Sequence, residues 1–116
     1  MDIFEQLQGW VAEQLGTVIV DGCGRENGAV GLFSQGVKVL RSWEDVTGIQ
    51  KRQVRYQFLL RIIGPPGAPM ADLLLRLQQQ AAQMGISATD GTLRKPGSDG
   101  LGIYEIRLCA EREEIL

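Results

Sequence analysis

The 116-residue sequence contains no histidine and only two cysteines, Cys23 and Cys109. Histidine is the usual general base at neutral pH and the commonest metal ligand, so its absence disfavours both acid–base catalysis and a zinc cluster. The two thiols are too far apart in the chain for a metal cluster, and we interpret them as free thiols in a reducing compartment. The sequence therefore predicts no catalytic residue, no cofactor-binding residue and no metal site.

Carboxylate pairs and serines offer no better candidates for catalysis. Glu44 and Asp45 lie on a predicted turn. Glu113 and Glu114 lie near the C-terminal end, and neither pair is expected in a pocket that would shift a pKa. No serine has the tight strand-to-helix turn of a nucleophile elbow around it. We therefore expect a protein that is not an enzyme.

Long apolar runs are also missing. No window approaches the roughly 18 apolar residues of a membrane span, and the N-terminus lacks the basic and apolar regions of a signal peptide. We expect no membrane partner and a cytosolic protein.

The net charge of −2 argues against a dedicated nucleic-acid binder, whose affinity rests on many phosphate contacts. An apolar fraction of 44% and a charged fraction of 22% are ordinary for a globular domain, which excludes a disordered chain.

The stretch 49–63 is the feature around which we expect the rest of the chain to be organised. From Val54 onward, apolar side chains recur at every second position, and the positions between them are mostly polar. At about 3.3 Å per residue such a strand spans a small domain, so we expect a central strand against which helices pack. Its predicted inward side chains are Val54, Tyr56, Phe58, Leu60 and Ile62.

Two segments have the spacing of amphipathic helices. Residues 2–15 carry one apolar stripe, with Asp2 as the N-cap and Gly16 as the C-terminal stop. Residues 70–84 follow Pro69, which suits the first turn of a helix, and carry a stripe of methionine and leucine. Such stripes are far more often part of a core than a cofactor site, so both helices are predicted to pack on the sheet.

The remaining strands are shorter. A polar, turn-rich segment covers 86–99, with room for at most one short strand around 92–94. The last strand alternates over 104–110 and is expected to pair with the central strand. The other predicted strands are 17–20, 29–33 and 37–43, the last of which forms a hairpin with the central strand. The sequence thus predicts one α+β domain over residues 1–116: a mostly antiparallel sheet of four to five strands with two amphipathic helices packed on it, in the order α-β-β-β-β-α-β.

One glycine-rich loop raises the question of phosphate binding. Gly22 and Gly24 follow a predicted strand, and bare backbone amides ahead of a helix can cradle an anion. Here 29–33 is extended rather than helical, and the loop lacks a Gly-Lys-Ser or Gly-Lys-Thr ending. We interpret it as a plain loop.

Several of these features occur together in one known family. They are the N-terminal helix 3–15, a glycine-containing segment before the strand 29–33, the hairpin leading into 54–61, the leucine-rich helix 70–84 and the closing strand 102–108. In this combination the sequence resembles, over nearly its whole length, the tail-terminator proteins of tailed bacteriophages, which are often labelled minor capsid or tail-completion proteins in prophages. It departs from the commoner family pattern in the short span after the first helix and in the charged end 111–116.

The resemblance implies a structural subunit. Proteins of this family assemble as a ring, usually a hexamer, on the head-proximal end of the tail tube, where the ring stops tube polymerisation and joins the tube to the neck or head connector. The implied partners are other copies of the chain, the tail-tube protein and, beyond it, sheath and neck proteins, with no small-molecule substrate and no membrane. The implied location is the bacterial host cytoplasm during assembly, and then the virion or a phage-tail-like particle.

Charge is unevenly distributed along the chain, since 38–61 is basic and 111–116 is acidic. A ring subunit needs two different contact faces, because heterologous contacts are the ones that close into rings. We therefore predict the basic hairpin and the acidic end as opposite halves of one contact. The predicted assembly residues are Arg41, Trp43, Lys51, Arg52, Arg55, Arg61, Glu111, Glu113 and Glu114. This hypothesis loses its main support if Arg55 and Arg61 are paired within the subunit.

Two alternatives remain open. A small nucleic-acid-binding module would use the basic hairpin 38–61, with Tyr56 or Trp43 as a platform on which bases stack. That function requires binding that weakens steeply with salt. The other alternative is an adaptor or chaperone-like monomer, which would show neither rings nor nucleic-acid binding.

Overall fold

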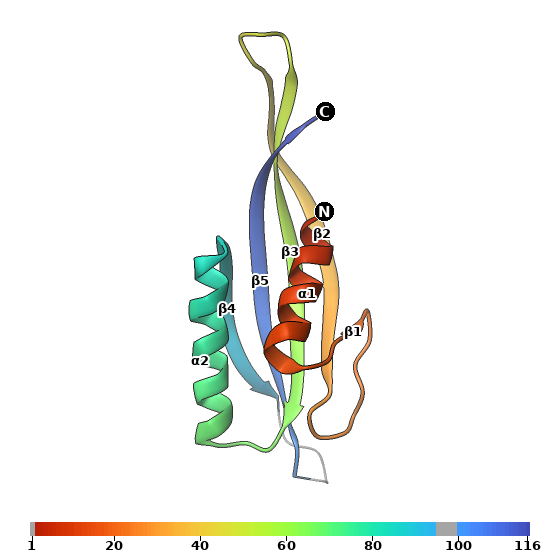
Figure 1. The fold of residues 1–116 in the computed structure, drawn as a ribbon, viewed down its shortest axis with the longest axis vertical. Coiled ribbons are helices and arrows are strands. Elements are labelled where there is room, and N and C mark those ends of the chain that lie inside the picture. Colours follow the sequence, from red (N-terminus) through yellow and green to blue (C-terminus); the bar gives the residue numbers. More distant parts are fainter. Residues whose placement is uncertain (1, 95–99) are drawn as a thin grey trace.

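Two helices pack on one face of a five-stranded sheet (Figure 1). The computed structural model describes residues 2–94 and 100–116. The elements are α1 (Ile3–Leu15), β1 (Ile19–Val20), β2 (Val30–Glu44), β3 (Gln50–Gly64), α2 (Ala68–Gln83), β4 (Ile86–Arg94) and β5 (Gly102–Ile115). The strand order is β1-β2-β3-β5-β4, and all neighbours are antiparallel except the parallel pair β1 and β2. The predicted α+β class, with a mostly antiparallel sheet and two amphipathic helices, is confirmed.

The predicted signals at both ends of α1 are confirmed. Oδ1 of Asp2 accepts a hydrogen bond of 2.8 Å from the backbone N–H of Glu5, which satisfies one free amide of the first turn. Gly16 ends the helix with φ at 82°, in the left-handed region where a side chain is disfavoured. The stripe between them buries Leu7 and Val11 completely.

Strand β2 is continuous, whereas the sequence predicted separate strands at 29–33 and 37–43. Its pairing with β3 shifts register by one residue at Gln35 and again at Leu40. Each extra residue forms a β-bulge, which changes the phase of the alternation without ending the strand. The two predicted strands are therefore one element, and the apparent gap between them is a bulge.

Residues 86–94 form strand β4. The strand predicted around 92–94 is therefore present but longer than expected, and the prediction of a turn-rich segment over 86–91 was wrong. Strand β4 pairs with β5, and this neighbour satisfies its backbone groups despite polar side chains. The breaker Asp90-Gly91 falls in a register shift of that pairing, where a bulge accommodates it. The rest of the predicted loop, 95–99, lies outside the described residues. The element order is therefore α-β-β-β-α-β-β and not α-β-β-β-β-α-β.

Helix α2 lies beside β4 and covers that side of the sheet (Figure 1). Pro69 occupies its first turn, where the missing N–H is not needed. The predicted stripe faces the core, with Met84 after the last turn left 39% exposed. The buried side chains of this stripe are Met70, Leu74, Leu77 and Ala81.

Strand β3 is central, as predicted, with β2 on one side and β5 on the other. Its inward side chains join those of both helices in one core, in which Leu60 is fully buried. Fully burying a leucine stabilises the fold by about 1.5–3 kcal/mol. Tyr56, toward the arm, is only partly buried, whereas Val54 beyond it is buried. Both described helices use this face, so the opposite face of the sheet carries no helix from the described residues.

Past the helices, β2, β3 and β5 continue as a narrow three-stranded projection, called the arm below, which comprises 38–55 and 111–116 (Figure 1). The molecule measures 58 × 24 × 23 Å. Its radius of gyration of 16.4 Å exceeds the value of about 13 Å for a compact domain of this length. Because the rest of the chain is compact, the arm accounts for this elongation.

Candidate assembly surface

The tip of the arm is the turn 45–49, and one carboxylate organises it. Oδ1 of Asp45 accepts hydrogen bonds from the backbone N–H of Thr47 at 2.8 Å, from the Thr47 hydroxyl at 2.6 Å and from the N–H of Ile49 at 3.0 Å. The Thr47 hydroxyl, followed by the Ile49 amide, lowers the pKa of Asp45 from 3.8 to about 2. The turn presents Val46 with its side chain fully exposed.

Basic side chains on the arm portion of β3 form ion pairs with the neighbouring strand β5. The N–O distances are 2.7 Å for Arg55–Glu111, 3.1 Å for Arg52–Glu114 and 3.4 Å for Lys51–Glu113. Lys51 also lies 3.4 Å from Asp45 at the tip. The carboxylates raise the pKa of both Lys51 and Arg55. Exposed pairs of this kind contribute little to the free energy of unfolding, so their main effect is to fix the register of β5 against β3.

On the helix side, a hydrogen bond between Tyr56 and Glu114 links β3 at the base of the arm to the end of β5. The phenol hydroxyl of Tyr56 donates to Oε2 of Glu114, and Nε of Arg52 donates to Oε1 of the same carboxylate. The phenol, ahead of Arg52, lowers the pKa of Glu114, and the carboxylate raises the pKa of Tyr56. Nη2 of Arg112 donates to Oε1 of Gln6 at 2.6 Å, which ties β5 to α1.

Arg61 lies in the body, on the helix-free face. Its Nε and Nη2 donate to Oε2 of Glu105 at 3.3 and 3.0 Å. The guanidinium carbon lies 5.0 Å from the ring centroid of Phe33, in the geometry of a cation–π contact. Glu105 is only 6% exposed, so Arg61 compensates a buried carboxylate within its own subunit.

The outer strand β2 carries the remaining predicted residues. Nε of Arg41 donates to Oε1 of Gln53 at 3.1 Å, and its guanidinium lies 4.6 Å from the ring of Trp43. Neither Arg41 nor Lys38 forms an ion pair with another residue in 2–94 or 100–116. On the outer strand β2, the carboxylates of the arm therefore leave both of these cations uncompensated.

The structure brings all the predicted assembly residues except Arg61 together on the arm. The basic hairpin and the acidic end, predicted as opposite halves of a contact, are neighbouring strands of one sheet. Arg55 and Arg61 are both paired within the subunit, so the hypothesis that the basic hairpin and the acidic end form opposite halves of one contact loses its main support. The same pairs weaken the nucleic-acid alternative, because carboxylates already balance the cations of β3. That these residues form an assembly surface stays a prediction.

No protein-family model matches this chain, and no curated protein matches it. Neither helix in the described residues is long and apolar enough to cross a membrane. Evidence for the function therefore comes from the surfaces of the chain itself.

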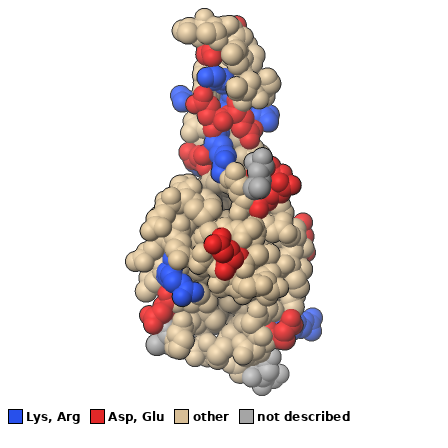
Figure 2. Space-filling view, viewed as in Figure 1, with Lys and Arg blue, Asp and Glu red and all other residues tan. Residues whose placement is uncertain are grey.

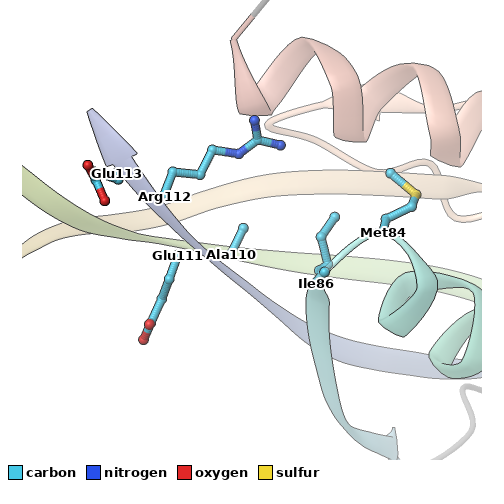
Figure 3. Close-up of a pocket in the computed structure, with 7 residues that line it drawn as sticks. Met84, Ile86, Ala110, Glu111, Arg112 and Glu113 are labelled. Carbon is cyan, nitrogen blue, oxygen red and sulfur yellow. The ribbon is translucent and has the colours of Figure 1, made fainter. Parts of the chain in front are cut away.

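An open hollow of about 380 Å³ lies at the foot of the arm (Figure 3). It forms where β4 begins, since past Ala110 the edge of β5 that faces away from β3 has no described strand beside it. Met84 and Ile86 line one side, and the start of the acidic end of β5 lines the other. Figure 3 shows Glu111 and Arg112 pointing to opposite sides of β5. The hollow therefore borders an open strand edge.

Two other hollows flank the sheet. One, of about 380 Å³, lies beside α1 on the helix side, with Val37 and Tyr56 among its walls. The other, of about 390 Å³, lies on the helix-free face beside Cys23 and Arg61. Burial raises the pKa of the Cys23 thiol there, and both Cys23 and Cys109 are free thiols, as predicted.

Sequence reasoning missed two carboxylates that matter to this surface. Glu105 stands at an outward position of the last strand, so its pattern predicted exposure, whereas the structure buries it beside Arg61. Only the register of β3 against β5 reveals that pair. Asp45 was placed on a turn without a role, although an Asp two residues before a Thr is a typical signal of a side-chain-capped turn.

Proposed function

We propose that this chain is a structural assembly subunit of the tail-terminator kind. In this proposal it forms a ring, with six copies as in the family it resembles, on the head-proximal end of a phage tail tube and joins the tube to the neck or head connector. Its partners are further copies of itself, the tail-tube protein, and sheath and neck proteins. It acts in the bacterial cytoplasm during assembly and then as part of a virion or phage-tail-like particle, without a catalytic role.

The arm is the observation that carries the proposal. A narrow projection of three strands buries little apolar surface of its own, so it gains stability when a partner covers it. Large apolar side chains are exposed at and near the end of the arm, and such exposure is typical of a surface that binds another protein. They are Val46 at 105%, Ile49 at 42%, Ile115 at 70% and Leu116 at 61% exposure.

The arm and the body also differ in charge. Figure 2 shows blue and red side chains crowded on the arm, while most of the body in the same view is uncharged. A subunit with a charged projecting arm and a mostly uncharged face on its body offers different chemistry to two partners. That difference suits a ring placed between a tube and a connector.

Tube growth in the presence of the chain tests the proposal. Tail-tube protein from the same genome is polymerised with and without the purified chain, and tube length and tube ends are examined by negative-stain electron microscopy. We expect shorter tubes with a ring at one end. Tubes of unchanged length with bare ends would overturn the proposal. A separate salt titration of DNA binding would favour the nucleic-acid alternative if affinity fell steeply with salt.

A matched pair of variants shows whether the arm tip is involved. Val46→Asp places a charge at the exposed tip, and Leu75→Asp places one on the exposed face of α2, where leucine is 59% exposed. Both sites are open to solvent, so neither substitution should unfold the subunit. We expect V46D to reduce capping and L75D to leave it unchanged. Equal capping by both variants would show that the tip takes no part.

A further inference from the structure

Both outer edges of the arm expose backbone groups that have no strand partner in 2–94 or 100–116. Strand β1 pairs with β2 only at Gly31 and Leu32, and β4 pairs with β5 only as far as Ala110. The β2 edge is therefore open along 38–44 and the β5 edge along 111–115. Open edges are templates for pairing with another strand, and natural proteins usually cover or blunt them.

The two open edges carry opposite charge at the same height along the arm. The pairing registers place two rows of cross-strand neighbours on the helix-free face, Lys38-Arg55-Glu111 and Arg41-Gln53-Glu113. Each row begins with a cation on β2 and ends with a carboxylate on β5. Lys38, Arg41, Glu111 and Glu113 are all exposed.

We propose that copies of this chain associate head to tail, with the β2 edge of one arm pairing with the β5 edge of the next. The inference rests on the proposed function, for which it supplies the contact between ring subunits. Strands β2 and β5 both run antiparallel to β3, so they point the same way. Copies standing side by side in one orientation therefore pair in parallel, as β1 and β2 already do. A contact of this heterologous type closes into a ring when the rotation between copies allows it.

Charge selects this arrangement over a two-fold dimer. In the head-to-tail contact, Lys38 of one copy stands level with Glu111 of the next, with no shift along the arm. A two-fold contact through β2 would instead bring Lys38 and Arg41 against like charges. One through β5 would bring Glu111 and Glu113 together. Opposite charges on neighbouring strands are favourable and like charges are unfavourable, so the two-fold contacts are disfavoured.

On the helix side of the arm, the two open edges also carry apolar side chains that can meet in the same contact. Val37 and Val39 project from β2 on the helix side and are 62% and 50% exposed. At the foot of the open β5 edge, Met84 borders the hollow of Figure 3 on that same side and is 39% exposed. Head-to-tail pairing brings the valines of one copy toward the methionine of the next. The contact thus matches charge with charge on one face and apolar with apolar on the other.

Disulfide trapping tests the contact directly. In a background with Cys23→Ser and Cys109→Ser, a Lys38→Cys variant is mixed with a mass-tagged Glu111→Cys variant under mild oxidation. Within one chain these positions flank β3 at about 10 Å, beyond disulfide reach, so any bond joins two copies. We expect heterodimers in the mixture and only traces of dimer from either variant alone. Homodimers as the main product, or no cross-link, would overturn head-to-tail pairing.

A charge reversal measures the strength of the same contact. Lys38→Glu should raise the self-association Kd roughly fivefold to tenfold in sedimentation equilibrium. The new carboxylate lies beside Arg55, so stability to urea should not fall. Arg107→Glu is the matched control, because Arg107 is exposed on the same face of β5 where β4 covers the edge at Thr89. Equal weakening by both variants, or by neither, would overturn the contact.

The tests of the contact and of the proposed function fail separately. A chain that cross-links between positions 38 and 111 but leaves tube growth unchanged would overturn the proposed function and keep the contact. A chain that caps tubes without this cross-link would keep the function and overturn the contact.

Discussion

Arg61 and Glu105 form an ion pair of 3.0 Å between the C-terminal part of β3 and the N-terminal part of β5, in which the carboxylate side chain is 7% exposed and the arginine 28%. Removing the arginine takes the ion-pair partner away from an almost fully buried charge, and desolvation then acts against it. We expect Arg61→Met to lower the free energy of unfolding by about 2–3 kcal/mol in urea titration, somewhat less than for a wholly buried pair.

Two further variants separate the ion pair from the loss of a long side chain. Arg107→Met changes an exposed arginine of β5 on the same face and should alter the unfolding free energy by less than about 0.5 kcal/mol. The double variant Arg61→Met with Glu105→Leu replaces both charges by apolar groups and should recover most of the loss. A double variant as unstable as the single one would contradict the role given to the pair.

At Gly31 the loop after β1 lies close against the sheet. A Cβ added there would overlap the carbonyl oxygen of Gly22 and lie 2.7 Å from Cβ of Cys23. We expect Gly31→Ala to destabilise the fold by about 1–3 kcal/mol, because backbone must shift to admit the methyl group. Gly36→Ala on the same strand is the control, since its nearest neighbour would be Oε1 of Gln57 at 3.6 Å, an ordinary contact. Equal melting temperatures for the two variants would contradict this account.

The helices and the central strand could be predicted because the signals for each of them lie within a single stretch of the sequence. The helical stripe of α1, its cap at Asp2 and its stop at Gly16 all lie within one stretch of sequence, and the alternation of β3 needs no partner to be visible. Strand β4 gave no such signal. Its polar residues become a strand only because the edge of β5, the next strand along the chain, offers hydrogen bonds that the pattern of 86–94 itself does not reveal.

The sequence predicts which residues make up the candidate surface, but it does not predict how they are arranged. The basic and acidic residues were visible, but which of them pair depends on β5 lying next to β3, a fact of topology. That neighbour uses Arg52, Arg55 and Lys51 internally and leaves Lys38 and Arg41 on the outer strand. The candidate surface therefore lies at the edges of the sheet and not in its middle. No pattern within one segment of the sequence predicts that position.

Acid should loosen the tip of the arm through Asp45. Its pKa is about 2 in the folded chain against an ordinary 3.8, so its contribution to stability is present above pH 3.8 and is lost as pH falls toward 2. We expect amide exchange at Thr47 and Ile49, whose N–H groups donate to this carboxylate, to accelerate over that interval. In Asp45→Asn the pH dependence should vanish. A variant that kept the acceleration would assign it to another group.

Tyr56 should control the titration of Glu114 at the arm. The phenol is the leading cause that holds the pKa of Glu114 below 4.5, so the contribution of this carboxylate to stability is present above pH 4.5 and is lost as pH falls through its folded pKa. In Tyr56→Phe we expect the Glu114 pKa, measured from the side-chain carboxyl carbon by NMR, to rise toward 4.5, with Arg52 keeping it from the full value. Tyr104→Phe makes the same chemical change in the core of the body and should leave Glu114 unaltered. An unchanged Glu114 pKa in Tyr56→Phe would mean that Arg52 and the neighbouring strands, rather than the phenol, hold the carboxylate ionised.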